Sequence, residues 1–165
     1  TLTGATNAYA GETTIGAGTL QFGASGAIPS GSGRGDVYNY GTLDLGGFSS
    51  TINGLFGNGT VDNSTGVSIY TLTIGGNNAT SIFSGLITNT SGTVAITKTG
   101  TGTLTLSNVA STYTGQTTID NGTLSVTKLA NGGVNSSIGA TAASTPILIG
   151  SATAATLSYT GGTDT

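Results

Sequence analysis

The chain has 165 residues, of which Gly, Thr, Ser and Asn make up 57%, whereas only nine are charged and the formal net charge is −3. It contains no His, Cys, Met or Trp, which excludes a Ser-His-Asp triad, a cysteine nucleophile and the usual zinc and haem ligands. Three cationic side chains cannot neutralise a run of phosphates, which argues against nucleic-acid binding.

Short segments in which apolar and polar residues alternate predict very short strands along the whole chain. Gly interrupts every candidate helix, and no window carries a sustained helical stripe. Composition alone is ambiguous, since Pro, Gly, Ser and Gln make up 32% of the chain, a value typical of disorder. The alternation decides for an all-β fold. The clearest strand segments are 43–45, 72–74, 94–96, 104–106, 124–126 and 147–149.

A Gly-Thr-(Leu/Val) motif recurs along the chain at intervals close to twenty residues or to half of twenty. A period near twenty in a strand-rich, Gly-rich chain predicts a β-solenoid of roughly eight coils, stacked in parallel at about 4.8 Å. We expect Gly and Asn at the corners, Thr and Ser outside, and a sparse apolar row inside. The motif begins at Gly18, Gly41, Gly59, Gly92, Gly102 and Gly122.

A longer repeat relates two distant segments at a constant offset of 104 residues. Residues 2–22 align without gaps on residues 106–126, with nine of 21 positions identical. Segment 97–104 has no counterpart before the first copy. We therefore expect residues 1–165 to be a single β-solenoid segment of a longer array. The matched pairs include Tyr9 and Tyr113, Gly11 and Gly115, Ile15 and Ile119, Gly18 and Gly122, and Leu20 and Leu124.

The tyrosines divide into two pairs with different expected roles. Because Tyr9 and Tyr113 occupy equivalent repeat positions, we expect each ring to pack over a coil corner with its hydroxyl bonded to backbone. Tyr38 and Tyr40 lie two residues apart, which predicts a pair on one side of a strand that could stack on sugars.

Two carboxylates form the only catalytic alternative with a structural basis. Asp44 and Asp62 lie 18 residues apart, about one coil, so they could stack and one pKa would then rise. Enzymes that act on polysaccharides use such acid pairs. No basic residue lies near them in sequence, and the alternation predicts that Asp44 points outward. We expect no catalytic residue, no cofactor and no metal site.

The remaining charged motifs favour structural roles. Arg34-Gly35-Asp36 is too short a motif to predict integrin binding, and a single imperfect Gly/Asp loop does not predict calcium binding. Lys98 and Lys128 are expected to be solvated turn residues.

Segments 97–107 and 112–124 closely resemble the autotransporter passenger-associated repeat, through Lys-Thr-Gly-Thr-Gly-Thr-Leu-Thr-Leu followed by Tyr-Thr-Gly. Segments 41–55 and 83–87 are also similar to it. The resemblance implies a right-handed parallel β-helix, exported by Gram-negative-type bacteria, with a stalk or secretion-assisting role and no catalytic residues. The motif positions are Lys98, Gly100, Gly102, Leu104, Leu106, Tyr113, Gly115, Ile119, Gly122 and Leu124, with Tyr9, Gly11, Ile15, Gly18 and Leu20 in the first copy.

Three hypotheses about function follow. The leading one is a non-catalytic, adhesin-like passenger segment attached at the bacterial outer membrane or secreted. A self-assembling extracellular filament or matrix subunit is the second, with flanking coils of the same chain or further copies as end-to-end partners. A module that binds polysaccharide or surface glycans is the third. None of them involves nucleic acid or direct membrane insertion.

Overall fold

The computed structural model describes residues 1–150 and 154–162. In these residues the chain forms short strands and no helix, as predicted. The strands are β1 (Thr13–Ile15), β2 (Thr19–Gln21), β3 (Val37–Asn39), β4 (Thr42–Asp44), β5 (Ser50–Ile52), β6 (Leu55–Phe56), β7 (Thr60–Asp62), β8 (Ile69–Ile74), β9 (Ser81–Phe83), β10 (Leu86–Ile87), β11 (Thr93–Lys98), β12 (Thr103–Leu106), β13 (Thr117–Ile119), β14 (Gly122–Val126), β15 (Leu148–Ile149) and β16 (Ala155–Tyr159).

Every pair of these strands is parallel, and the pairs stack into three faces that wind around one axis. Face 1 holds β1, β3 and β6, then β9, β12, β14 and β16, joined by a bridge between Gly57 and Phe83. Face 2 holds β2, β4, β7 and β10, and face 3 holds β5, β8, β11, β13 and β15. Parallel pairing without helical crossovers is the arrangement expected of a β-solenoid.

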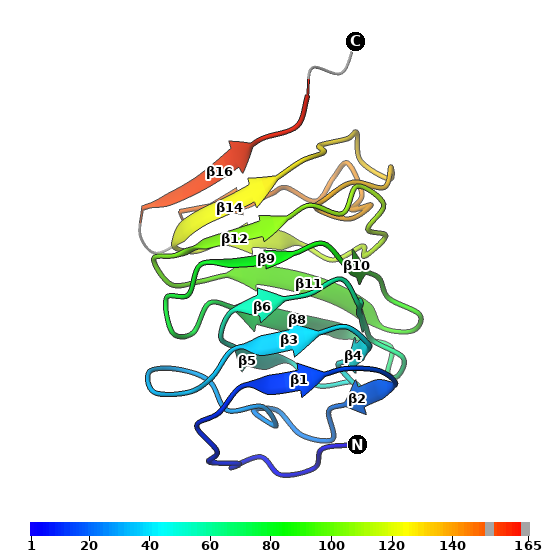
Figure 1. The fold of residues 1–165 in the computed structure, drawn as a ribbon. Coiled ribbons are helices and arrows are strands. Elements are labelled where there is room, and N and C mark those ends of the chain that lie inside the picture. The colour runs from blue at the N-terminus through cyan, green and yellow to red at the C-terminus, as the bar shows by residue number, and fades with distance from the viewer. Residues whose placement is uncertain (151–153, 163–165) are drawn as a thin grey trace.

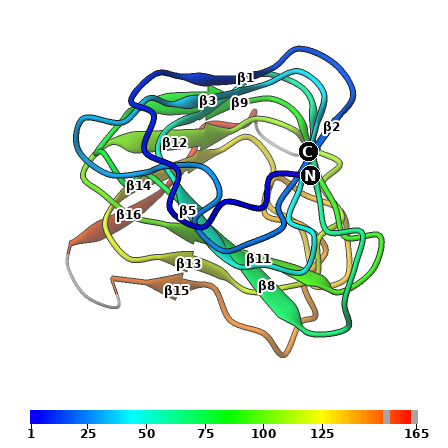
Figure 2. The same cartoon turned by 90° about the horizontal axis from the view of Figure 1, so that it is seen from below.

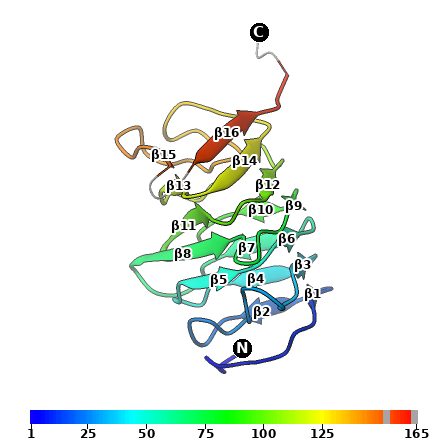
Figure 3. The same ribbon diagram turned by 90° about the vertical axis from the view of Figure 1, so that its left-hand side faces the viewer.

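The coils build a rod with the two termini at opposite ends (Figure 1). Seen along the axis, face 1 and face 3 lie on opposite sides, with β2 of face 2 at a third side (Figure 2). A side view shows the strands rising in chain order from β1 to β16 (Figure 3). Successive strands of face 1 begin 18 to 33 residues apart, so the coil length varies around the expected twenty.

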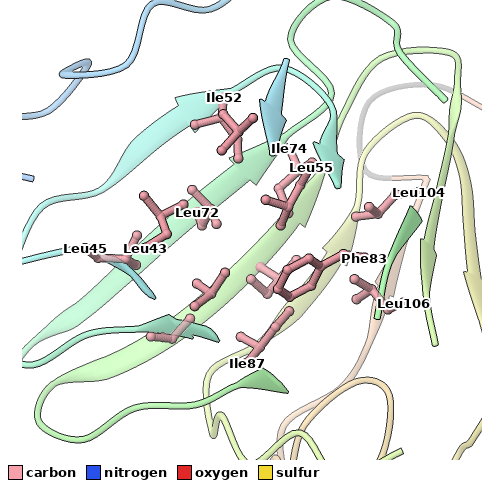
Figure 4. Close-up of a cluster of buried hydrophobic side chains, with 14 of the residues drawn as sticks. Leu43, Leu45, Ile52, Leu55, Leu72, Ile74, Phe83, Ile87, Leu104 and Leu106 are labelled. Carbon is pink, nitrogen blue, oxygen red and sulfur yellow. The ribbon is translucent and has the colours of Figure 1, made fainter. Parts of the chain in front are cut away.

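One apolar core runs along the axis of the rod. Alternate residues of each strand point inward and meet those of the other two faces (Figure 4), so each coil contributes only a few side chains. Burying one such side chain contributes about 1.5–3 kcal/mol, and stacking shares that contribution between neighbouring coils. The centre of the core includes Leu43, Ile52, Leu55, Val61, Leu72, Ile74, Phe83, Val94, Ile96, Leu104, Ile119, Leu124 and Val126.

The faces explain the irregular intervals of the Gly-Thr-(Leu/Val) motif. The copies at Gly18, Gly41 and Gly59 lead into face 2, and the copy at Gly92 leads into face 3. The copies at Gly102 and Gly122 lead into face 1. An interval of ten residues is therefore one step between faces, whereas an interval near twenty is one whole coil. The motif encodes entry into a strand, whichever face that strand joins.

The C-terminal end of the rod departs from the predicted pattern. Segment 147–149 alternates like an inward-facing strand, but Ile147, Leu148 and Ile149 are 37%, 39% and 50% exposed. The reason is that β15 is the last strand of its sheet, so only β13 covers it. Between β14 and β15 the chain leaves the stack in an excursion over residues 127–147, which is held by an antiparallel bridge between Ser111 and Ser136.

Candidate functional site

The conserved chemistry that the sequence offers is its repeat unit, and glycine at the corners is the first element of that unit. A Cβ at Gly59 would lie closer than 3.0 Å to the carbonyl oxygen of Gly41, one coil below. A Cβ at Gly85 would meet the carbonyl oxygen of Gly59 in the same way. These carbonyls accept the inter-coil bonds, as in Thr60 N–H to Gly41 O at 2.8 Å. Space, more than positive φ, therefore requires glycine here.

Lys98 is the largest difference between the predicted and the observed site. It was expected on a solvated turn, but it ends β11 with its side chain inward and is 1% exposed. Its register neighbours are Ile74 and Ile119, so a lysine occupies a column of isoleucines. The aliphatic part of the side chain fills that column, which explains why a cation is tolerated there.

The Lys98 ammonium group is satisfied by backbone carbonyls alone. Nζ donates to the oxygens of Thr99 at 2.6 Å, Gly100 at 2.7 Å and Asn121 at 3.3 Å. Burial lowers the pKa of Lys98 below its ordinary value. The side chain thus caps the corner that joins β11 to β12 and links it to the next coil. Its role is to hold the Gly-Thr-Gly corner in place, which the spacing alone did not reveal.

The two tyrosines of the repeat make the same local bond. The hydroxyl of Tyr113 lies 2.8 Å from Oγ1 of Thr117, and that of Tyr9 lies 2.8 Å from Oγ1 of Thr13. The expected bond to backbone is wrong, because the threonine four residues ahead reaches the hydroxyl first. Tyr113 is fully buried, whereas Tyr9 is 40% exposed. Burial raises the pKa of Tyr113 strongly.

Asp44 and Asp62 do stack as register partners of β4 and β7, but they are not a free acid pair. Asp44 is 3% exposed, not outward in solvent. Its carboxylate accepts bonds from Ser64 N–H at 3.0 Å and Ser64 Oγ at 2.5 Å. Asp62 accepts the equivalent pair from Thr90, at 2.8 and 2.7 Å. Each aspartate therefore clamps a hydroxyl residue one coil further on.

The electrostatics of Asp44 run opposite to the predicted coupling. Burial raises the pKa of Asp44, but the bonds from Ser64, Gly46 N–H and the Gln21 amide lower it further, so the net pKa is below its ordinary value. A carboxylate held ionised by four donated bonds is a structural acceptor, not a proton donor. The pair therefore lacks the raised pKa that a general acid requires.

Both charged ends of Arg34-Gly35-Asp36 are used within the fold. Arg34 Nη1 donates to the carbonyl oxygens of Ala8 and Tyr9 on the preceding coil. Asp36 Oδ1 accepts from Gly54 N–H at 2.8 Å and from Asn77 Nδ2 at 2.9 Å. The motif joins coils instead of presenting a free loop.

The second tyrosine pair is split by the strand that carries it. Tyr38 points outward from β3 and its ring stacks on Phe56, with centroids 4.9 Å apart and an interplanar angle of 11°. The ring planes face each other along the stack, so this pair leaves no open ring face between the two coils. Tyr40 follows β3 and is 52% exposed. The expected two-tyrosine sugar platform is therefore wrong in its geometry, although Tyr40 remains accessible.

Buried asparagines are the site residues that sequence reasoning missed. Asn53 is fully buried; its Nδ2 donates to the oxygens of Arg34 and Gly35 at 2.8 and 3.1 Å, and its Oδ1 accepts from Gly31 N–H. Asn63 is also fully buried, and its Oδ1 accepts from Gly47 N–H at 2.8 Å. Each follows a strand directly. That position is the signal which could have identified them as corner caps.

No group of three or more His, Cys, Asp or Glu that could hold a metal ion occurs among the described residues. The same residues contain no helix long and apolar enough to cross a membrane. The best-formed hollow has a volume of about 230 Å³ and lies beneath the excursion, between Thr117, Val134 and Ile147. Because its walls are mostly small and uncharged, nothing in it resembles a reaction centre.

Comparison with known proteins gives one result that bears on identity. A family model, the passenger-associated-transport-repeat, matches residues 1–22 and 96–126. No curated protein and no solved structure matches the chain. The two matched segments contain the two copies found through the 104-residue offset, and the second extends back to include Lys98. The repeat unit in this chain is therefore the passenger-associated-transport-repeat, present in two copies, as the resemblance predicted.

Proposed function

We propose that this chain is a structural, non-catalytic segment of an autotransporter passenger, carried to the bacterial surface or secreted, with an adhesin-like stalk role. The pair of passenger-associated-transport-repeat matches within a parallel stack of strands supports this proposal. The resemblance adds a right-handed winding and about eight coils, counting the incomplete ones at either end.

The contacts of the charged residues support the non-catalytic part of the proposal. Asp36, Asp44 and Asp62 each accept hydrogen bonds that join neighbouring coils. Lys98 and Arg34 donate to backbone carbonyls. A catalytic group must be able to exchange protons with a substrate. Here these groups hold coils together, which is the work of a scaffold.

Surface exposure on producing cells tests the exported location. Antibodies raised against the 165-residue chain should label intact cells, or the chain should be found in the culture medium. Brief protease treatment of intact cells should remove the cell-bound label, while a cytoplasmic marker protein survives. Label that appears only after the cells are lysed and the envelope is opened would contradict the proposal.

End-to-end assembly is a second candidate, favoured by the last coil. Leu148, Ile149 and Tyr159 are 39%, 50% and 44% exposed there. Exposed strand edges of this kind are templates for further pairing. Analytical ultracentrifugation over a hundredfold range of concentration separates the alternatives: growing oligomers support assembly, and a constant monomer mass contradicts it.

A further inference from the structure

Face 1 carries a regular array of hydroxyl side chains that none of the structural contacts uses. We define the face-1 array as the outward residues of β12, β14 and β16. Two columns run along the rod, and both are in register from strand to strand. One column is entirely threonine, and the second is threonine followed by two serines. The six residues are Thr103, Thr123 and Thr156 in the first column and Thr105, Ser125 and Ser158 in the second.

The spacing of the array is set by the backbone. Neighbours along a column are about 4.8 Å apart, and the two columns are separated by two residues of strand, about 6.5 Å. Beneath the array, Leu104, Leu106, Leu124 and Val126 are 2% exposed or less. Because inter-coil bonds and the packed core hold the strands, these positions are fixed relative to one another.

The chemistry of the array is uniform and neutral. Each threonine presents a hydroxyl and a methyl group, and each serine a hydroxyl. In residues 1–150 and 154–162, none of the printed contacts engages the Oγ1 atoms of Thr103, Thr105 or Thr123 with another protein group. No charged side chain lies within β12, β14 or β16. These hydroxyls are therefore left to water.

These properties select the kind of surface that the array fits. Phosphate or carboxylate ligands need cationic groups, and the array has none. Sugar stacking needs an open aromatic face, which the array also lacks. A neutral grid of hydroxyl and methyl groups with two fixed spacings fits a neutral, flat and periodic partner. The spacings are of the size of the oxygen repeats in hexagonal ice.

We propose that the face-1 array binds ice. Hydroxyls at fixed positions hold first-shell waters at lattice-like spacing, and the methyl groups between them order the waters that they cannot bond. Because the protein scaffold is rigid, this water layer is already arranged when it meets a growing crystal. The inference rests on the array alone and does not depend on the passenger assignment.

Face 3 offers a matched control within the same chain. Thr51, Thr73, Thr97 and Thr118 form one in-register column there. The column beside it is interrupted, because Ala95 is the partner of Thr71 and carries no hydroxyl. Face 3 therefore has a single complete row instead of two. Thr73 and Thr123 are both half-buried, and each lies between threonines of the adjacent strands.

Partition into slowly growing ice tests the proposal on the full 165-residue chain. We expect the unaltered chain and Thr73→Lys to concentrate in the ice fraction, and Thr123→Lys to remain in the liquid. Thr103→Lys is a second array variant, in case Thr123→Lys does not fold. Circular dichroism melts identify the variants that keep the stack.

Three outcomes would overturn the proposal. One is exclusion of the unaltered chain from ice at every growth rate. Another is an equal effect of Thr73→Lys and Thr123→Lys, because it would remove the link to face 1. The third is retention on crystalline cellulose without enrichment in ice, which would identify the array as a polysaccharide surface. Enrichment in ice that only the array variants abolish supports the proposal.

Discussion

The two copies of the repeat have nearly the same sequence but different surroundings. In the second copy Tyr113 and Ile119 are fully buried, whereas in the first copy Tyr9 is 40% and Ile15 is 5% exposed. A Cβ at Gly115 would meet the carbonyl oxygen of Val94, whereas the space around Gly11 is open. The second copy lies between coils, and the first lies at the end of the rod (Figure 1).

The copies also lie on different faces. Ile15 belongs to β1 on face 1, whereas Ile119 belongs to β13 on face 3. The same threonine bond to the tyrosine hydroxyl forms in both. Local geometry therefore follows from the repeat itself, whereas burial and steric constraint come from the coils above and below. Substitutions at equivalent positions should separate these two contributions.

The largest difference is expected at the tyrosines. Tyr113→Ala removes a fully buried ring and should lower the free energy of unfolding by about 3–5 kcal/mol. Tyr9→Ala removes a partly exposed ring and should cost much less. Urea denaturation of both variants measures the difference. Equal losses would mean that the ring contributes through its local threonine bond and not through its burial.

The glycine pair should give the next largest difference. Gly115→Ala places a methyl group against the Val94 carbonyl, and overpacking of this kind costs about 1–3 kcal/mol. Gly11→Ala meets no atom within 4 Å and should be neutral or slightly stabilising, because it restricts the unfolded chain. Thermal melts of the two variants provide the measurement. A destabilised Gly11→Ala would show that the motif needs glycine for a reason other than space.

A smaller contrast is expected at the isoleucines. Ile119→Val removes one methyl group from the fully buried column and should cost about 0.5–1.5 kcal/mol. Ile15→Val should cost less, because its side chain is next to solvent at the first coil. Chemical denaturation with matched m-values is needed, since a change in m would indicate an altered unfolded state. A greater loss for Ile15→Val would reverse the comparison.

The subtlest test uses Lys98, which has no counterpart in the first copy. Burial lowers its pKa in the folded chain, so between the folded value and the unfolded value the unfolded chain binds more protons. Stability due to this group therefore rises with pH across that window. The melting temperature of the unaltered chain relative to Lys98→Met should increase toward pH 10.5.

Lys128→Met, on the turn after β14, is the control for this measurement. The alkaline loss expected from Tyr113, whose pKa is raised in the fold, is common to all the variants and cancels in the difference. A difference that stays flat with pH, or that Lys128→Met reproduces, would show that the Lys98 ammonium remains protonated throughout.

Strand positions could be predicted from the alternation of apolar and polar residues, and the repeat from its offset. The roles of single polar residues could not. Lys98 looks like a turn residue because nothing local shows that three carbonyls converge on its ammonium group. Asp44 looks solvent-exposed because its partner Ser64 belongs to the next coil. Contacts between coils depend on which residues stack, and variable coil lengths hide that from the sequence.

By itself, the amino-acid sequence determined the period, the all-β class, the two repeat copies and the glycines at the corners. These follow from steric and hydrophobic preferences that act within a few residues. Only the tertiary structure decided the face each strand joins, the burial of Tyr113 against the exposure of Tyr9, and the hydroxyl array on face 1. Those features depend on the stacking of one coil on another, which brings together residues about twenty positions apart.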